Sequence, residues 1–541
     1  MENKNTIIAI VLITAIWFGY TLFFPPQPPQ QQAGTPSVQA EQTSANASDV
    51  QLMEESRQKA PEKFSEVTHS KDFSSEETVV DTDVLRLTIS NEGGVIRNLE
   101  MKKYGLTSAP DSPRVTLVDS PSSFNGTLRL SGHEGFGLSG SAPYSFQNTA
   151  RELVLQQDQQ EEVVLAAKLE GGLEVVRVYR FTGGHYDIET SVQLFNRGSQ
   201  PLSGRAVLSL VNGWSEDQKG SMYEFAGPSV FAEESLNQED VDDLGVDGVS
   251  FSKDVLWTAF EEKYFASILV PASGFSRIRL LQDGPRVENQ ILSDDLVLNP
   301  GESTELNFTF FAGPKRVDLL TSVGQRIDEL VDFGWFAFIS HPLLIALKFF
   351  YGYIGNYGIA IILLTFLIKM LFWPLTQKSY TSMKSMQKLQ PQMQKLREKY
   401  KNDRERMNRE LMELYKTHRV NPLGGCLPML IQIPVFFALY KVLLFSIELR
   451  HAPFMLWITD LSAKDPYYVT PLIMGASMFV QQKMMPTQMD PNQARIMMMM
   501  PVIFTFMFLN FPSGLVIYWL VNNLLTIGQQ YLINRKGAEA T

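Results

Sequence analysis

Five apolar runs are crowded into the last third of the chain, and a sixth lies near residue 1. The sixth run covers 6–24, and the five crowded runs cover 355–375, 423–446, 467–482, 496–510 and 514–533. A bilayer takes roughly 20 apolar residues of helix, so the longer runs can span one. Two of the runs are short, and short apolar runs are also found as core helices. Because three further apolar runs follow the two long spans 355–375 and 423–446, the pattern predicts a multi-pass α-helical membrane protein with six transmembrane helices.

The charges of the loops give these helices one orientation. Residues 377–421 carry 12 Lys/Arg against 5 Asp/Glu, and positively charged loops stay in the cytoplasm. Both termini, including the tail 536–541, are then cytoplasmic, and the long segment after the first span is periplasmic. Residues 26–340 have a net charge of −22, whereas residues 341–541 have +11. This asymmetry indicates two environments, with the basic part facing a membrane surface or an anionic partner.

Composition divides the chain ahead of the crowded runs into three parts. Residues 1–24 are predicted to be a signal-anchor helix, because large apolar residues and prolines follow where a cleavage site would need small ones. A cleaved signal peptide is the alternative. Residues 25–60 are rich in Pro and Gln and predict a linker. Residues 61–316 contain short segments of alternating polarity, such as 174–181 and 305–311, which predict a large all-β sandwich domain.

No residue pattern in the sequence points to an enzyme. Cys426 is the only cysteine, and the six histidines are scattered without a metal-binding spacing. Phosphate-loop and nucleophile-elbow motifs are absent from the sequence. We therefore expect no catalytic residue, cofactor or metal. The β domain is interpreted as a folded spacer or docking domain, with a carbohydrate-binding cleft as the alternative.

Residues 317–340 differ from the β domain before them. Apolar residues recur at helical spacing between charges, and Trp335, Phe336 and Phe338 follow as a cluster. This pattern predicts an amphipathic helix lying on the membrane surface, with its aromatic side chains at headgroup depth. A helix packed on the β domain fits the same pattern equally well.

The basic loop contains two further helical stripes. Met386, Leu389 and Met393 belong to the first, and Leu411 and Leu414 belong to the second. We expect two amphipathic helices that form a cytoplasmic hairpin over 380–418, with Pro391 as a kink or a restart. Its basic face is either a generic solvated surface or a docking arm. The residues predicted for docking are Lys384, Lys388, Lys395, Lys399 and Arg406.

Lys369 lies inside the second predicted span. A charge at the bilayer centre costs about 2.5–3.5 kcal/mol, so such a residue normally faces a protein interior or a wet cavity. Snorkelling towards the cytoplasmic surface is the alternative. Polar residues on other spans favour a shared groove, which we predict to contain Lys369, Thr365, Gln432, Asn522 and Tyr518. The spans contain no carboxylate that could serve as a proton-relay partner, which argues against a proton-coupled transporter.

Several motifs in the helical part resemble the YidC family of membrane protein insertases. The resemblance is close over about 340–535, and the layout of the whole chain is similar to the Gram-negative branch of the family. The motifs are Ser379–Met383, Asn421–Pro428, Ile431–Pro434, Asp465–Tyr468 and Phe511–Leu515.

The resemblance implies both an architecture and a function. In the family, five core helices, here within 341–535, surround a hydrophilic groove, and the outer domain is a β-supersandwich. The family inserts and helps fold membrane proteins in the bacterial inner membrane, alone or with the Sec translocon. Its implied partners are nascent clients, a ribosome or targeting factor, and membrane lipids. The family usually has arginine where this chain has Lys369, which puts bidentate carboxylate pairing in doubt. A secondary transporter and an assembly factor without insertion activity are the rival functions.

Overall fold

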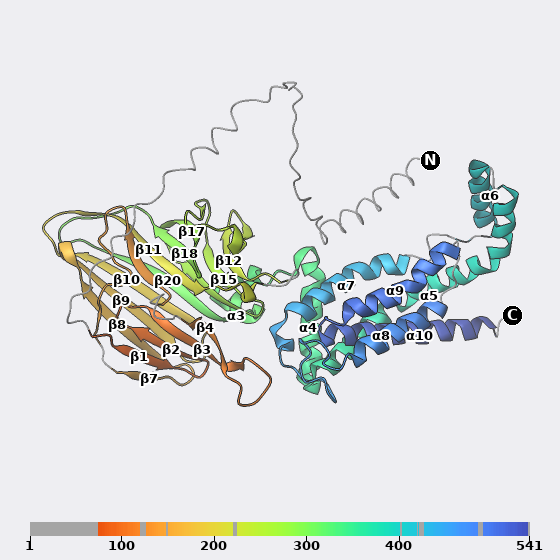
Figure 1. Ribbon diagram of the computed structural model, residues 1–541, viewed down its shortest axis with the longest axis horizontal. Helices are drawn as coiled ribbons and strands as arrows, with labels where there is room; N and C mark the ends of the chain where they lie inside the picture. The colour runs from red at the N-terminus through yellow and green to blue at the C-terminus, as the bar shows by residue number, and fades with distance from the viewer. Residues whose placement is uncertain are drawn as a thin grey trace, which may run out of the picture. The chain divides into compact units, whose positions relative to one another are not determined.

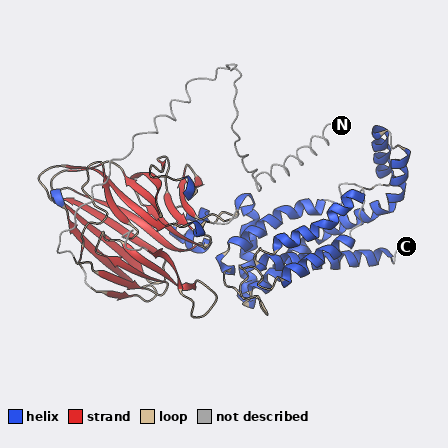
Figure 2. Cartoon of the chain, in the orientation of Figure 1, coloured by secondary structure: helices blue, strands red, loops and turns tan. Residues whose placement is uncertain are grey.

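The chain has a β-rich part followed by a helical part, drawn in red and blue in Figure 2. The computed structural model describes residues 74–119, 126–147, 150–219, 224–400, 403–418, 420, 427–484 and 491–538. The predicted signal anchor (1–24), the predicted linker (25–60) and the motif residues 421–426 lie outside the described residues.

Three sheets make up the described β-rich part. The first has the order β4 (Arg114–Asp119), β3 (Ile96–Gly105), β2 (Leu85–Ser90), β1 (Glu77–Asp81), β7 (Glu152–Val154). The largest has the order β13 (Ser235–Gln238), β12 (Gly227–Ala232), β15 (Trp257–Glu261), β16 (Phe265–Pro271), β20 (Ser303–Pro314), β10 (Asp187–Asn196), β9 (Leu173–Thr182), β8 (Gln160–Lys168), β6 (Ser145–Phe146). The third has the order β14 (Val249–Phe251), β17 (Phe275–Asp283), β18 (Arg286–Ser293), β11 (Leu202–Gly213), β19 (Leu296–Leu298), with β5 (Arg129–His133) also paired to β11.

The strand β9 shows why the sequence forms these sheets. Side chains alternate between the two faces of a strand, and in β9 the alternate residues from Leu173 to Phe181 are buried. Its neighbours β8 and β10 pair with it in antiparallel register, with Val178 opposite both Val164 and Ser191. The prediction of a β-rich domain is confirmed, and its buried residues form one hydrophobic core across the sheets.

The single helix predicted over 317–340 is wrong. The structure has α3 (Val317–Val323), η4 (Ile327–Leu330) and η5 (Gly334–Phe336) in its place. Gly324 and Arg326 have positive φ angles of 85° and 60°, which end one helix and turn the chain before the next. The apolar side chains of Leu320, Ile327 and Leu330 are buried in the core of the β-rich part, which explains the helical spacing without a membrane surface.

Seven α-helices are described after α3 and the two 3₁₀ turns. They are α4 (Ala337–Ile354), α5 (Tyr357–Lys399), α6 (Arg404–Thr417), α7 (Leu427–Phe445), α8 (Val469–Met484), α9 (Pro491–Phe508) and α10 (Ser513–Ala538). Figure 1 shows α5, α7, α8, α9 and α10 running alongside one another. By length and composition, Gly334–Ile354 and Tyr357–Met386 could each cross a membrane, while 432–445 and 498–508 are shorter apolar stretches.

Two features of these helices depart from the sequence expectation. The helix α4 was not predicted, although it exposes large apolar side chains such as Phe338, Ile345 and Tyr353. The helix α5 is also longer than the predicted span 355–375, because it continues through Pro374 and Pro391 to form the first arm of the hairpin. A restart at Pro391 is therefore wrong.

The helix directions follow from which residues meet. Lys369 and Thr376 on α5 contact Thr526 and Gln529 on α10 in the same chain order, so these two helices run parallel. In contrast, Phe436 of α7 contacts Trp519, whereas the later Tyr440 contacts the earlier Phe511, so α7 and α10 run antiparallel.

One end of the helix group is closed by the segment between α7 and α8. Ser513 N donates to Ala463 O (2.7 Å), and Gly514 N donates to Leu461 O (2.9 Å) at the start of α10. Asn356 Nδ2 donates to Phe454 O (2.9 Å) at the start of α5. Gly358 allows this approach, because a Cβ there would lie 2.0 Å from the Phe454 ring. Both α5 and α10 therefore begin at this closed end.

Candidate functional site

Lys369 is a buried cation between two helices. Its side chain extends from α5 and is 8% exposed. The ammonium donates to Thr526 Oγ1 at 2.6 Å and to Asn522 Oδ1 at 3.4 Å, and both acceptors belong to α10. In the described part of the chain, no ion pair with a carboxylate is recorded for Lys369. The positive charge is therefore solvated by neutral groups and keeps its capacity to attract an anion.

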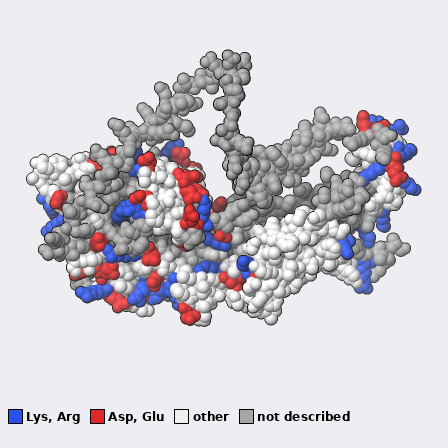
Figure 3. All heavy atoms as spheres, in the orientation of Figure 1, with Lys and Arg blue, Asp and Glu red and all other residues white. Residues whose placement is uncertain are grey.

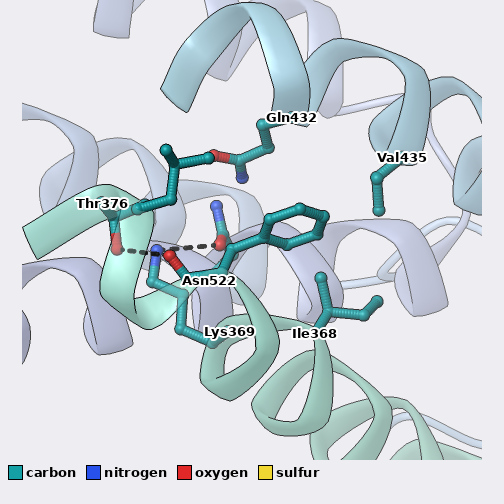
Figure 4. A pocket seen from close by; sticks show the side chains of 8 residues that line it. Ile368, Lys369, Thr376, Gln432, Val435 and Asn522 are labelled. Atoms are coloured by element: carbon teal, nitrogen blue, oxygen red, sulfur yellow. Dashed lines mark hydrogen bonds between the residues drawn. The ribbon is translucent and has the colours of Figure 1, made fainter. Parts of the chain in front are cut away.

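A small hollow of about 20 Å³ lies beside this ammonium. Three polar residues besides Lys369 line it, namely Thr376, Gln432 and Asn522. Figure 4 shows these side chains meeting from α5, α7 and α10, with the Lys369–Asn522 hydrogen bond dashed. The remaining lining residues are apolar: Ile368, Phe372, Leu375 and Val435. The hollow thus combines one cation, amide and hydroxyl groups, and an apolar wall.

The polar face of α10 continues beyond the hollow. Asn522, Thr526 and Gln529 follow one another at spacings of four and three, so they share one helix face. Gln529 Nε2 donates to Thr376 Oγ1 at 2.8 Å. The adjacent Asn523 points to a different helix and donates to Ser477 Oγ of α8 at 3.1 Å. These hydrogen bonds join α5, α8 and α10 through buried polar side chains.

The structure brings together three of the five predicted groove residues. Lys369, Gln432 and Asn522 all line the hollow. Tyr518 is buried and makes a side-chain hydrogen bond with Gln432, so it lies behind the lining. Thr365 is also buried, but its hydroxyl donates to Ile361 O of its own helix at 2.6 Å. Neither of these two residues lines the hollow.

Sequence reasoning missed Thr376, Thr526 and Gln529. Thr526 and Gln529 could have been found from Asn522, because residues four and seven positions later share its helix face. Thr376 likewise lies seven residues after Lys369 on α5. Hydroxyl groups inside an apolar span are easily overlooked, because they can satisfy themselves on their own helix backbone.

The predicted hairpin is formed by the end of α5 and by α6. Leu389, Met393 and Leu411 are buried against one another, and Leu396, Met407 and Leu414 pack around them. Asp403 caps α6 by accepting a hydrogen bond from Arg406 N at 3.0 Å. The two apolar stripes satisfy each other, as predicted, and leave the basic face outside.

The five predicted docking residues differ in environment. Lys388, Lys395, Lys399 and Arg406 are exposed, whereas Lys384 is half-buried. Lys399 and Arg406 both lie near the Tyr400 ring, at 5.2 Å and 5.4 Å from its centroid. In Figure 3 the helical part shows a broad uncharged surface, and charged side chains gather on the hairpin.

Comparison with known proteins identifies the family. A family model described as the YidC periplasmic domain matches residues 77–346, and one described as the 60Kd inner membrane protein matches residues 349–540. The membrane protein insertase YidC of Geobacter sulfurreducens is 47% identical over 538 residues, which cover 98% of each chain. The chain belongs to the YidC family of membrane protein insertases.

Two further matches accompany these. The membrane protein insertase YidC of Geobacter metallireducens is 45% identical and is covered to 99%, as is this chain. A crystal structure of an active YidC insertase with its first transmembrane domain resolved is 19% identical, with a TM-score of 0.36, over 85% of this chain and 93% of that one. The two family models and the curated relatives show that this chain is an inner membrane protein with a periplasmic domain, and that it is a membrane protein insertase, not an enzyme.

Proposed function

We propose that α5, α7, α8, α9 and α10 cross the inner membrane and hold a hydrophilic groove for the client around Lys369. With the signal-anchor helix this makes six spans, and both termini and the hairpin are cytoplasmic. The parallel run of α5 and α10, with α7 antiparallel, supports this threading, because alternate spans must reverse direction. The outer domain is then a β-supersandwich in the periplasm.

The depth of Lys369 supports its role. It lies 12 residues after Tyr357, the first residue of α5, which corresponds to about 18 Å at 1.5 Å per residue. The hydrocarbon core is about 30 Å thick, so this ammonium is well inside it. From Lys369 the lining of the hollow continues along α5 to Thr376, towards the hairpin. The groove is therefore open on the cytoplasmic side and closed by the segment between α7 and α8 on the periplasmic side.

The groove lowers the barrier for the client's polar outer segment. An unsatisfied backbone group in hydrocarbon costs several kcal/mol, so a polar segment crosses a full bilayer at great cost. Gln432, Asn522 and Thr376 offer hydrogen bonds partway through, and Lys369 attracts acidic client residues. The client's apolar helix then leaves along the exposed apolar faces into lipid. No nucleotide or other cofactor takes part in this step.

The partners of this process are matched to separate surfaces. Nascent membrane-protein clients enter the groove, alone or handed over by the Sec translocon. A ribosome or targeting factor docks on the basic face of the hairpin. Membrane lipids contact the apolar helix faces. The buried charge of Lys369, paired only with neutral groups among the described residues, is the observation that carries the proposal.

Reconstitution tests the proposed insertion activity directly. The purified full chain is placed in liposomes and given a single-span client with a short acidic outer segment, and protease protection of that segment is measured. Protected client without any other protein supports an insertase groove. A folded, correctly oriented chain that protects no client contradicts it and favours an assembly factor. Solute exchange without client insertion would favour a transporter.

A further inference from the structure

Thr526 has a hydroxyl whose orientation is set by its own helix. Its Oγ1 donates to Asn522 O one turn earlier, at 2.7 Å. A hydroxyl has a single proton, so this bond leaves only acceptor lone pairs for other groups. One of them accepts from Lys369 Nζ at 2.6 Å, the shorter of the two hydrogen bonds recorded for the ammonium. The side chain of Thr526 is 4% exposed, so water does not readily replace it.

We propose that Thr526 is a positioning residue that holds the Lys369 ammonium at groove depth, so that it meets acidic residues of the client. This inference rests on the proposed function of Lys369. Thr526 is not among the residues that line the hollow, so the proposed role does not require it to contact the client. It acts through Lys369, whose long side chain has several rotatable bonds and, without a fixed acceptor, can turn towards the headgroups.

The geometry divides the ammonium's three donors between two tasks. An ammonium has three N–H groups. Thr526 and Asn522 of α10 accept two of them. Asn522 also lines the hollow, so its amide can turn to a client, whereas Thr526 is committed to its own helix and to Lys369. The remaining donor is left for the hollow that Lys369 lines. Hydrogen bonds from a charged donor are stronger than neutral ones, so the single hydroxyl of Thr526 is enough to hold the ammonium in place.

The test uses the full chain in liposomes and two single-span clients that differ in two outer-segment residues, Asp in one and Asn in the other. Thr526→Val keeps the shape but removes the acceptor, and Thr526→Ser keeps the hydroxyl. We expect Thr526→Val to lower insertion of the acidic client about tenfold, the lower end of the range expected for one hydrogen bond to a charge, with less than about twofold loss for the neutral client. Thr526→Ser should insert both like the wild type.

Thr505→Val is the matched control. Thr505 Oγ1 donates to Pro501 O of its own helix α9 at 2.6 Å, in the same way as Thr526, but no bond to Lys369 is recorded for it. It should not change the ratio between the two clients. If Thr526→Val lowers both clients equally, or neither, the positioning role is overturned.

A double variant separates an effect that acts through Lys369 from a general effect on folding. Thr526→Val should have no further effect on the client ratio when Lys369→Gln is already present, because the ammonium it positions is gone. An equal further change in that ratio overturns the inference. Failure of the proposed function and failure of the Thr526 inference give different results. If the Lys369→Gln variant inserts the acidic client as well as the wild type does, the proposed function itself is refuted. Loss with Lys369→Gln but not with Thr526→Val refutes only the role of Thr526.

Discussion

The buried charge of Lys369 is the feature of a single residue on which the proposed function depends most. Truncation of Lys369 to Ala removes the cation but leaves apolar walls that pack without it. We expect Lys369→Ala to lower client insertion about a hundredfold, the size of one to two charge-assisted hydrogen bonds, while the apparent Tm stays within a few degrees. Lys369→Arg should retain activity, because the positive charge remains. The measurement is client insertion in a strain depleted of its own insertase. Full insertion by Lys369→Ala would show that this charge is not required.

Asp465 is a residue whose role is structural. Its carboxylate is fully buried and accepts from Trp457 Nε1, Tyr467 N and both the backbone and the hydroxyl of Thr470, at 2.7–3.0 Å. Burial by itself would raise the pKa of Asp465, but the hydrogen bonds from Thr470, Tyr467 and Trp457 outweigh it and lower this pKa from its usual value. We expect Asp465→Asn to destabilise the protein by about 2 kcal/mol, because an amide nitrogen cannot accept these bonds.

The pH dependence of this effect has a definite sign. A lowered folded-state pKa stabilises the protein above the unfolded value and loses that contribution as pH falls through the folded value. The difference in Tm between wild type and Asp465→Asn should therefore be constant from pH 7 to pH 5 and shrink below about pH 3.9. Asp111→Asn, at an exposed position, is the control and should match the wild type. A wild-type advantage that grows in acid would contradict the assignment.

At the scale of elements, the hairpin of α5 and α6 buries its apolar residues between the two helices and exposes its basic residues. Neutralising Lys388, Lys395, Lys399 and Arg406 should lower ribosome–nascent-chain crosslinking and insertion yield about threefold, with a smaller effect on Tm, because all four are exposed. Binding through this face should also weaken with salt, since exposed charges are screened beyond about 8 Å at physiological ionic strength.

Two variants sharpen the hairpin experiment. Lys399 and Arg406 contact the Tyr400 ring, so the pair Lys388→Gln and Lys395→Gln tests charge without that packing. Replacement of the exposed, uncharged Gln392, Gln394 and Asn408 by Ala controls for surface changes on the same helices. Lost folding with no separate loss of capture would mean that the hairpin is a structural element and not a docking arm.

At the scale of the whole molecule, a deletion tests the interpretation of the β-rich part as a spacer. The groove residues lie entirely on α5, α7 and α10, so removal of much of 60–310 should leave insertion of simple clients within about twofold. Removal of 317–339 should be tolerated less well. The measurement is growth and client insertion after depletion of the wild-type chain. Complete loss of insertion would refute the interpretation of the β domain as a spacer.

The structure adds a control to this deletion. Leu320, Ile327 and Leu330 are buried in the core of the β-rich part and would become exposed without it. Exposed apolar side chains promote aggregation, which would imitate a functional loss. The deletion should therefore also be made with these three residues changed to Ser. Recovery of insertion in that variant would assign the loss to aggregation.

The sequence alone determined the class, the family and the position of the buried charge. Apolar runs and alternating strands are local patterns, so they predicted the helical region and the β-rich domain, and the motif residues identified the family. Lys369, Gln432 and Asn522 could be found because polar residues within apolar spans stand out in the sequence. The hairpin stripes could be found because residues at spacings of three and four share a helix face.

Only the tertiary structure decided what these residues contact. The spacing of Leu320, Ile327 and Leu330 suits a membrane surface and a protein core equally well. The structure shows that all three are buried in the core of the β-rich part. Pro391 has no neighbour in the sequence that tells whether α5 ends or continues. The hydrogen bond that Lys369 donates to Thr526 joins positions 157 residues apart, and no local pattern encodes a pairing between helices. Periodicity shows which face of a helix is buried, whereas packing determines what that face meets.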